Sequence, residues 1–131
     1  MSILGRKISA KWVAGLAIAM VVGALLPVMT KTPAREITLV ARDMAFYLEG
    51  DDTHPNPDIE VKAGEHVTIV VRNEDRGMTH DFALPAAAAS MNLLEWNERG
   101  EVTFEVPTTP GTYEYVCRPH LLMMKGTLKV Y

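Results

Sequence analysis

The residues best suited to chemistry lie in one short stretch near the C-terminal end of this 131-residue chain. Cys117 is followed by His120 and then by two methionines, Met123 and Met124. A thiolate, an imidazole and a thioether are soft or borderline metal ligands, and this combination suits copper. Because the sequence contains one cysteine, Cys117 has no partner for a disulfide within the chain. The stretch therefore predicts a metal site built around Cys117.

A second imidazole is expected from His80, which stands at the start of an apolar strand. In a β-sandwich this strand can lie beside the strand that ends at Cys117. Two imidazoles and one thiolate in a trigonal plane, with a long axial bond to a methionine sulfur, form a blue-copper (type 1) site. We therefore predict one copper ion per chain, bound by His80, Cys117, His120 and one of the two methionines.

The elements that must position these side chains are short strands with period-two alternation, separated by turn signals. The expected strands are Glu36–Ala41, Met44–Leu48, Ile59–Lys62, Glu65–Asn73, Thr79–Leu84, Val102–Val106, Tyr113–Cys117 and Thr127–Tyr131. The segment Pro85–Trp96 is rich in helix formers and is expected to make a short helix or an irregular excursion. The pattern predicts an all-β fold, an antiparallel sandwich or barrel with a single core.

The N-terminal end predicts a membrane-targeting helix. Three basic residues precede an uncharged, largely apolar run of 19 residues, Trp12–Thr30, which is close to the length of about 20 that spans a bilayer. Positive charge ahead of the run favours export of the rest of the chain. Residues 1–30 are thus expected to be a signal peptide or a transmembrane anchor, with cleavage left open. Residues 31–35 are expected to form a linker, and residues 36–131 the folded domain.

Charge is divided unevenly between these parts. The first 34 residues carry four basic and no acidic side chains, whereas the remainder carries nine Lys and Arg against sixteen Asp and Glu, a net charge of −7. A domain this acidic is unsuited to nucleic acid, because binding phosphates requires Lys and Arg. It suits a protein partner with a basic docking face.

The stretch from Gly111 to Leu128 resembles the copper loop of the cupredoxins, such as plastocyanin, amicyanin and azurin. Cys117-x-x-His120 is similar to the plastocyanin and amicyanin pattern, and His120-Leu-Leu-Met-Met-Lys-Gly-Thr-Leu is similar to the azurin ending. The resemblance extends over most of residues 36–131. It implies an eight-stranded Greek-key sandwich with copper near one end, beneath a mostly apolar surface that the loop histidine reaches.

The resemblance also bears on the axial ligand and on the surroundings of the site. Alignment on Lys-Gly-Thr favours Met124, whereas counting forward from His120 as in amicyanin favours Met123. Pro119 has no N–H, so the backbone N–H of Asp81 is the expected donor to the Cys117 sulfur. Family members often have asparagine where this chain has Asp81. We hypothesise that Asp81 pairs with Arg118 and ties the two ligand-bearing segments together.

The resulting functional prediction is a type 1 copper protein, not an enzyme, that carries single electrons between membrane or periplasmic redox proteins. The alternative is copper delivery or storage, but a thiolate and two imidazoles held on a rigid sheet favour retention of the ion. A copper enzyme needs a second histidine cluster, and four histidines leave none for it. His54 and His66 are expected to be structural or solvated. The expected partners are redox proteins and, through residues 1–30, a membrane, with the chain acting as a monomer.

Overall fold

The computed structural model describes residues 31–131, so the N-terminal helix expected in residues 1–30 lies outside the described part. The strands are β1 (Arg35–Arg42), β2 (Ala45–Leu48), β3 (Ile59–Val61), β4 (His66–Asn73), β5 (Ala83–Leu84), β6 (Ala89–Ser90), β7 (Arg99–Glu105), β8 (Gly111–Val116) and β9 (Lys125–Val130). Two 3-10 turns, η1 (Pro85–Ala87) and η2 (Arg118–His120), are the helical elements of this part of the chain. Neither of them is of a length or apolarity that would cross a membrane.

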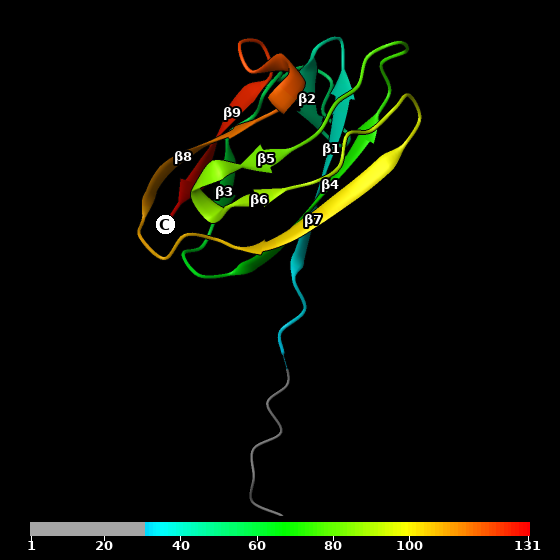
Figure 1. Ribbon diagram of the computed structural model, residues 1–131. Coiled ribbons are helices and arrows are strands. Elements are labelled where there is room, and N and C mark those ends of the chain that lie inside the picture. Colours follow the sequence, from blue (N-terminus) through cyan, green and yellow to red (C-terminus); the bar gives the residue numbers. More distant parts are fainter. Residues whose placement is uncertain (1–30) are drawn as a thin grey trace, which may run out of the picture. The chain divides into compact units, whose positions relative to one another are not determined.

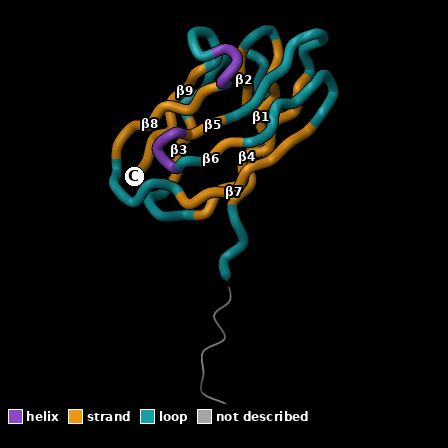
Figure 2. Tube along the Cα trace, viewed as in Figure 1, coloured by secondary structure: helices purple, strands orange, loops and turns teal. Residues whose placement is uncertain are grey.

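The strands form the two layers of an all-β sandwich, as the sequence predicts (Figures 1 and 2). One sheet has the order β2-β1-β4-β7 and the other has the order β3-β9-β8-β5-β6. Most neighbouring strands are antiparallel, but β1 runs parallel to β4 and β3 runs parallel to β9. The chain changes sheet between β2 and β3 and again after β3, so strands distant in sequence become neighbours. The pairing of β5 with β8 brings the His80 and Cys117 segments together.

The core lies between the sheets and explains the alternation in the sequence. Val67, Ile69 and Val71 on β4 face inward and are fully buried, as their spacing indicates. Aromatic rings fill the centre, where Phe82 stacks on Tyr115 at a centroid distance of 5.4 Å. Cys117 and Met124 belong to the same buried cluster. The metal-binding candidates are therefore built on the end of the core and share its rigid packing.

Close packing of β8 against β9 sets the register of the strands on either side of the Cys117 loop. Tyr115 lies opposite Gly126, and its hydroxyl donates a hydrogen bond of 2.6 Å to the carbonyl oxygen of Pro57. A Cβ atom at Gly126 would overlap the Tyr115 ring. Glycine is thus required at the start of β9 because an aromatic ring crosses directly over its backbone.

The segment between β5 and β7 contains both a short helical turn and irregular chain, the two alternatives expected for Pro85–Trp96. Pro85–Ala87 makes a single 3-10 turn, β6 follows at Ala89–Ser90, and the rest up to β7 is largely irregular. Ala89, Met91 and Leu94 from this segment are buried against the core. Counting β6, the described residues contain nine strands rather than the eight that the family resemblance implies.

Candidate metal centre

Cys117 and His120 are held by the turn that joins β8 to β9. Cys117 directly follows β8, and its backbone N–H donates to the carbonyl oxygen of Met124 across the base of the turn, at 2.9 Å. The N–H of His120 donates back to the Cys117 carbonyl oxygen at 3.1 Å, and the N–H of Met124 donates to the His120 carbonyl oxygen at 2.9 Å. The backbone of the loop is therefore closed by its own hydrogen bonds, and this fixes the directions of the Cys117 and His120 side chains.

His80 comes from a different segment of the same sheet. It precedes β5, whose Ala83 pairs with Val116 of β8, so the antiparallel register carries the chain back past Cys117. His80 is also held on its other side by a pair of backbone hydrogen bonds with Leu94, at 3.1 and 2.8 Å. Its side chain has no exposed surface. The sequence prediction that His80 lies beside the Cys117 strand agrees with this arrangement.

These three side chains converge on one point. The Nδ1 atoms of His80 and His120 lie 3.7 and 3.6 Å from the Cys117 sulfur, and the donor atoms of all three lie within 4.8 Å of one another. With metal bonds of about 2.0 Å to nitrogen and about 2.3 Å to sulfur, trigonal geometry separates nitrogen from sulfur by roughly 3.7 Å. The spacing and the chemistry of the donors therefore both fit a copper ion bound by two imidazoles and a thiolate.

The two methionines have opposite environments. Met124 is fully buried in the core cluster beside Cys117, whereas the Met123 side chain is 59% exposed. Sequence reasoning left both open as axial ligands, with a preference for Met124. Burial of Met124 in the same core cluster as Cys117 favours Met124, because a fourth ligand would have to share the buried site of the other donors.

Asp81 and Arg118 form the pair that the sequence suggested. The Asp81 carboxylate is fully buried and accepts a hydrogen bond of 2.7 Å from the Arg118 backbone N–H and one of 2.5 Å from its Nε. The guanidinium also donates to the carbonyl oxygen of Met91 at 2.8 Å. Since Asp81 follows His80 and Arg118 follows Cys117, this pair joins the two ligand-bearing segments.

Burial determines the protonation of the candidate ligands. It raises the pKa of the Cys117 thiol, and the backbone N–H groups of Asp81 and His120 act in the opposite direction. The sequence predicted that the backbone N–H of Asp81 contacts the Cys117 sulfur, but it did not predict the same contact from the N–H of His120. Burial, together with the neighbouring His80, lowers the pKa of His120. The imidazole of His120 is therefore available as a neutral ligand at neutral pH, and the thiol requires a cation to become a thiolate.

Sequence reasoning missed a residue that contacts His80. The Asp75 carboxylate lies 2.8 Å from Nε2 of His80, on the opposite side of the ring from the Cys117 sulfur. The signal is the pattern Asn73-x-Asp75 ahead of His80, because the side-chain oxygen of Asn73 accepts the backbone N–H of Asp75 in an Asx turn. The Asn73 amide group also donates to the carbonyl oxygens of Met78 and Leu94. Asn73 thus organises the loop that carries Asp75 and His80.

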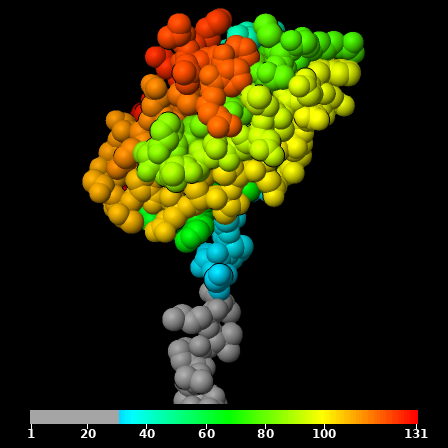
Figure 3. Space-filling view, viewed as in Figure 1, coloured from blue at the N-terminus to red at the C-terminus, as the bar shows by residue number. Residues whose placement is uncertain are grey.

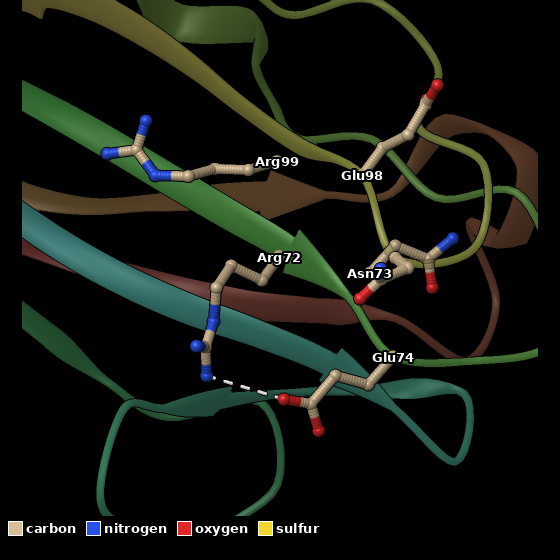
Figure 4. Close-up of a pocket in the computed structure, with 6 residues that line it drawn as sticks. Arg72, Asn73, Glu74, Glu98 and Arg99 are labelled. Atoms are coloured by element: carbon tan, nitrogen blue, oxygen red, sulfur yellow. Dashed lines mark hydrogen bonds and ion pairs between the residues drawn. The ribbon is translucent and has the colours of Figure 1, made fainter.

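A small hollow of about 90 Å³ adjoins Asn73 at the end of β4 (Figure 4). Its lining residues are Arg72, Asn73, Glu74, Asn97, Glu98 and Arg99. Arg72, Glu74 and Arg99 are engaged in surface pairs, such as Arg72 with Glu74 at 3.3 Å, and Glu98 accepts the backbone N–H of Glu95. None of the three converging side chains contributes to it, so the hollow is separate from the metal centre.

Exposed apolar residues flank His120 in its loop, in keeping with the apolar surface that the family resemblance implies. The loop that carries it forms one end of the domain, drawn in orange in Figure 3. Leu121, Leu122 and Met123 are exposed, with Leu122 at 90%, and Pro119 is exposed as well. His120 itself is partly exposed, unlike His80. His120 is therefore the ligand candidate through which the buried site reaches the surface.

The remaining histidines lie away from this centre. His54 is exposed and its Nδ1 contacts the Asp51 carboxylate at 2.7 Å, while His66 is exposed on β4. Within residues 31–131, the cluster of His80, Cys117 and His120 is the group whose side chains stand as close together as metal ligands. Both histidines have the solvated environments expected from the sequence.

Known proteins resemble this chain in sequence or in fold. The plastocyanin of chloroplasts in Physcomitrium patens is 36% identical over 85 residues, but the match spans about half of that protein (47%) and 56% of this chain. Among solved structures, auracyanin A, a "blue" copper protein from the green thermophilic photosynthetic bacterium Chloroflexus aurantiacus, has a TM-score of 0.59 at 24% identity, covering 76% of this chain and all of that one.

Auracyanin B has a TM-score of 0.61 at 25% identity, with 79% of this chain and 93% of that chain covered. Rusticyanin from Thiobacillus ferrooxidans has a TM-score of 0.57 at 22% identity, with 77% of this chain and 79% of that chain covered. The family model described as a cupredoxin-like domain matches residues 16–130 of this chain. The family resemblance seen in the sequence is thereby confirmed: this protein belongs to the cupredoxin-like family.

Proposed function

We propose that this protein is a type 1 copper protein that carries single electrons between redox partners on the outer side of a membrane. In this proposal His80, Cys117 and His120 are the equatorial ligands and Met124 is the axial ligand. A role as a carrier rather than an enzyme is part of this proposal, and membership of the cupredoxin-like family supports it. The observation that carries the proposal is the convergence of two imidazole nitrogens on one thiol sulfur, at 3.7 and 3.6 Å.

The bound ion would supply a one-electron couple, and the protein's own part is to hold the ligands still. A site that changes little between oxidation states has a small reorganisation energy, which favours fast electron transfer. Three features support this rigidity: backbone hydrogen bonds hold His80 against Leu94, backbone hydrogen bonds close the Cys117 loop, and Asp81 ties Arg118 to the opposite segment.

Burial of the ligands distinguishes this proposal from copper delivery or storage. His80, Cys117 and Met124 are fully buried, and only His120 reaches solvent. A carrier that hands copper to another protein needs ligands that the acceptor can contact. Because three of the four proposed ligands are buried, the site favours retention of the ion instead. Electrons would then pass through the exposed edge of the His120 ring.

The surface around His120 supports docking of a redox partner there. Leu121, Leu122 and Met123 are exposed apolar residues that follow His120 in its loop, and His120 is the only one of the four proposed ligands that is not buried. The net charge of −7 beyond residue 34 favours encounter with partners that present basic faces. We propose that the chain acts as a monomer in these encounters.

The proposed location rests on the sequence of residues 1–30. Basic residues ahead of the apolar run Trp12–Thr30 favour delivery of the domain to the periplasmic or extracytoplasmic side, tethered to the membrane or released by cleavage. Membrane fractionation of cells that express the chain, combined with N-terminal sequencing of the product, tests this. Intact chain in the cytoplasmic fraction would contradict it.

Electron transfer is tested by the self-exchange rate of the copper-loaded full chain, measured from NMR line broadening in mixtures of the Cu(I) and Cu(II) forms. A carrier is expected to show fast exchange and to retain copper during incubation with a competing copper chelator. Slow exchange combined with rapid loss of copper to the chelator would instead support copper delivery.

A further inference from the structure

The two ring nitrogens of His80 face different groups. Nδ1 faces the Cys117 sulfur at 3.7 Å, while Nε2 lies 2.8 Å from Oδ2 of Asp75. A neutral imidazole carries one N–H, and an ionised carboxylate can only accept a hydrogen bond. The proton of His80 is therefore on Nε2 when Asp75 is ionised, which leaves the lone pair of Nδ1 directed toward the metal centre.

The β1–β2 turn holds the Asp75 carboxylate in place. The backbone N–H of Asp43 donates to Oδ1 at 2.7 Å, and that of Met44 donates to Oδ2 at 3.2 Å. Both turn residues have positive φ, 50° and 59°, although neither is glycine. Left-handed backbone at such residues costs free energy and persists where the surroundings require it. Here the turn presents two N–H groups to one carboxylate.

The Asp75 carboxylate is poorly screened from His80. Its oxygens accept the backbone N–H groups of Asp43 and Met44 and lie 2.8 Å from Nε2 of His80, an arrangement that favours the ionised carboxylate. The Asp75 side chain is 14% exposed, and His80 is fully buried. Within residues 31–131, His80 is the basic group within ion-pair distance of Asp75, whereas the Asp81 charge is offset by Arg118. The negative charge of Asp75 therefore acts mainly through His80.

We propose that Asp75 is a positioning residue that fixes the tautomer of His80 and favours Cu(II) over Cu(I) at the metal centre. The inference rests on the proposed function, because it assigns a role toward the copper ion. A carboxylate bonded to a ligating imidazole makes the imidazole a stronger donor, and its charge stabilises the more highly charged ion. The centre should therefore have a lower reduction potential than it would have if the hydrogen-bond partner of His80 were neutral.

The tautomer is tested in the metal-free wild-type protein, with no variant needed. Nitrogen-15 NMR of the full chain, recorded where the His80 ring is neutral, is expected to show the proton on Nε2 and an unprotonated Nδ1. A predominantly Nδ1-protonated His80 would overturn the proposal. This measurement contains no copper, so its outcome is independent of whether the chain carries electrons.

The effect on copper is tested with Asp75→Asn, which removes the charge and keeps the shape and an acceptor oxygen. Loss of an outer partner of a metal-binding histidine typically costs about 10- to 100-fold in metal affinity. We expect Cu(II) affinity to fall at least tenfold relative to Cu(I) affinity, which for a one-electron couple raises the reduction potential by at least about 59 mV.

Glu74→Gln is the matched control. Glu74 is the neighbour of Asp75 in the chain, its side chain is exposed and pairs with Arg42 and Arg72, and the substitution removes the same charge. It is expected to change the potential far less. Equal shifts in the two variants, or an unchanged potential in Asp75→Asn, would overturn the proposal while leaving the copper site intact. Absence of a type 1 site in the wild-type protein would instead refute the proposed function.

Discussion

The buried carboxylate of Asp81 accepts two hydrogen bonds from Arg118, one from its backbone N–H at 2.7 Å and one from its Nε at 2.5 Å. One residue of this pair follows His80 and the other follows Cys117. The pair therefore connects the two segments that carry the candidate ligands, and it does so without occupying the ligand positions themselves.

Removal of the Arg118 side chain tests this connection. In Arg118→Ala the buried Asp81 carboxylate keeps one backbone donor and loses its guanidinium, which should lower the free energy of unfolding of the metal-free protein by about 1–3 kcal/mol. Copper affinity should fall about tenfold, with a changed reduction potential. Thermal unfolding and copper titration measure these effects.

Arg99→Ala is the control for this prediction, because Arg99 is exposed and its partners Glu36 and Glu101 are exposed too. Surface pairs of this kind contribute about 0–1 kcal/mol. An Arg118→Ala protein with the copper affinity and potential of the wild type would refute the proposed connection.

The axial ligand is tested by replacing each methionine with leucine, which has nearly the same volume. Met124→Leu should keep the fold and raise the reduction potential, because loss of a thioether donor destabilises Cu(II) more than Cu(I), which accepts fewer ligands. Met123→Leu should leave the potential and the electron paramagnetic resonance spectrum unchanged. The reverse pattern would assign the axial position to Met123.

Tyr115 makes stability sensitive to alkali. Burial and the charge of Asp58 raise the pKa of Tyr115 above its usual value, so above a pH of about 10 the unfolded chain releases a proton that the folded chain retains. The folded state binds more protons in that range, so the free energy of unfolding falls as pH rises, by at most about 1.4 kcal/mol per pH unit from this group.

Urea unfolding of the wild type and of Tyr115→Phe isolates this contribution. It is measured from about pH 8 to about pH 11, a range that spans the ordinary tyrosine pKa of about 10. The variant should be less stable by about 0.5–1.5 kcal/mol at neutral pH, since it lacks the hydrogen bond to Pro57. Its stability should then decline less steeply in alkali. Parallel pH profiles for the two proteins would show that Tyr115 is not the group responsible.

Replacement of Gly126 tests the register of β8 and β9. In Gly126→Ala the new methyl group would overlap the Tyr115 ring, so the ring or the strand must move. Overpacking of this kind costs about 1–3 kcal/mol, which thermal unfolding can detect. A variant as stable as the wild type would mean that the two strands separate easily at this point.

Much of the fold and the site could be predicted from the sequence, because the relevant patterns are local. Alternation on β4 identified the buried face of that strand, and the strand-turn-strand pattern around Cys117 and His120 placed both on one loop. His80 required one further step, the pairing of β8 with the strand that follows His80, and a sandwich places such strands side by side.

The parts that could not be predicted depend on contacts between distant segments. The pattern Asn73-x-Asp75 indicates an Asx turn, but the contact of Asp75 with His80 could not be predicted from it. That contact depends on a turn whose residues Asp43 and Met44 precede Asp75 by 32 and 31 positions and adopt left-handed backbone without being glycine. The alanine-rich stretch after Pro85 favours a helix by propensity, but burial of Ala89 and Met91 against the core limits it to one 3-10 turn. β7 begins at Arg99, earlier than expected, because pairing with β4 continues into polar residues.

The central claim is that Cys117 binds copper as a thiolate together with two imidazoles. The most direct test is the visible absorption and electron paramagnetic resonance spectrum of the full chain after addition of Cu(II), with His66→Ala as a control on an exposed histidine. The account predicts an intense thiolate-to-copper band and an unusually small parallel hyperfine splitting, unchanged in His66→Ala and lost in Cys117→Ser. A weak band with ordinary tetragonal copper parameters would show that Cys117 is not a ligand and would contradict the account.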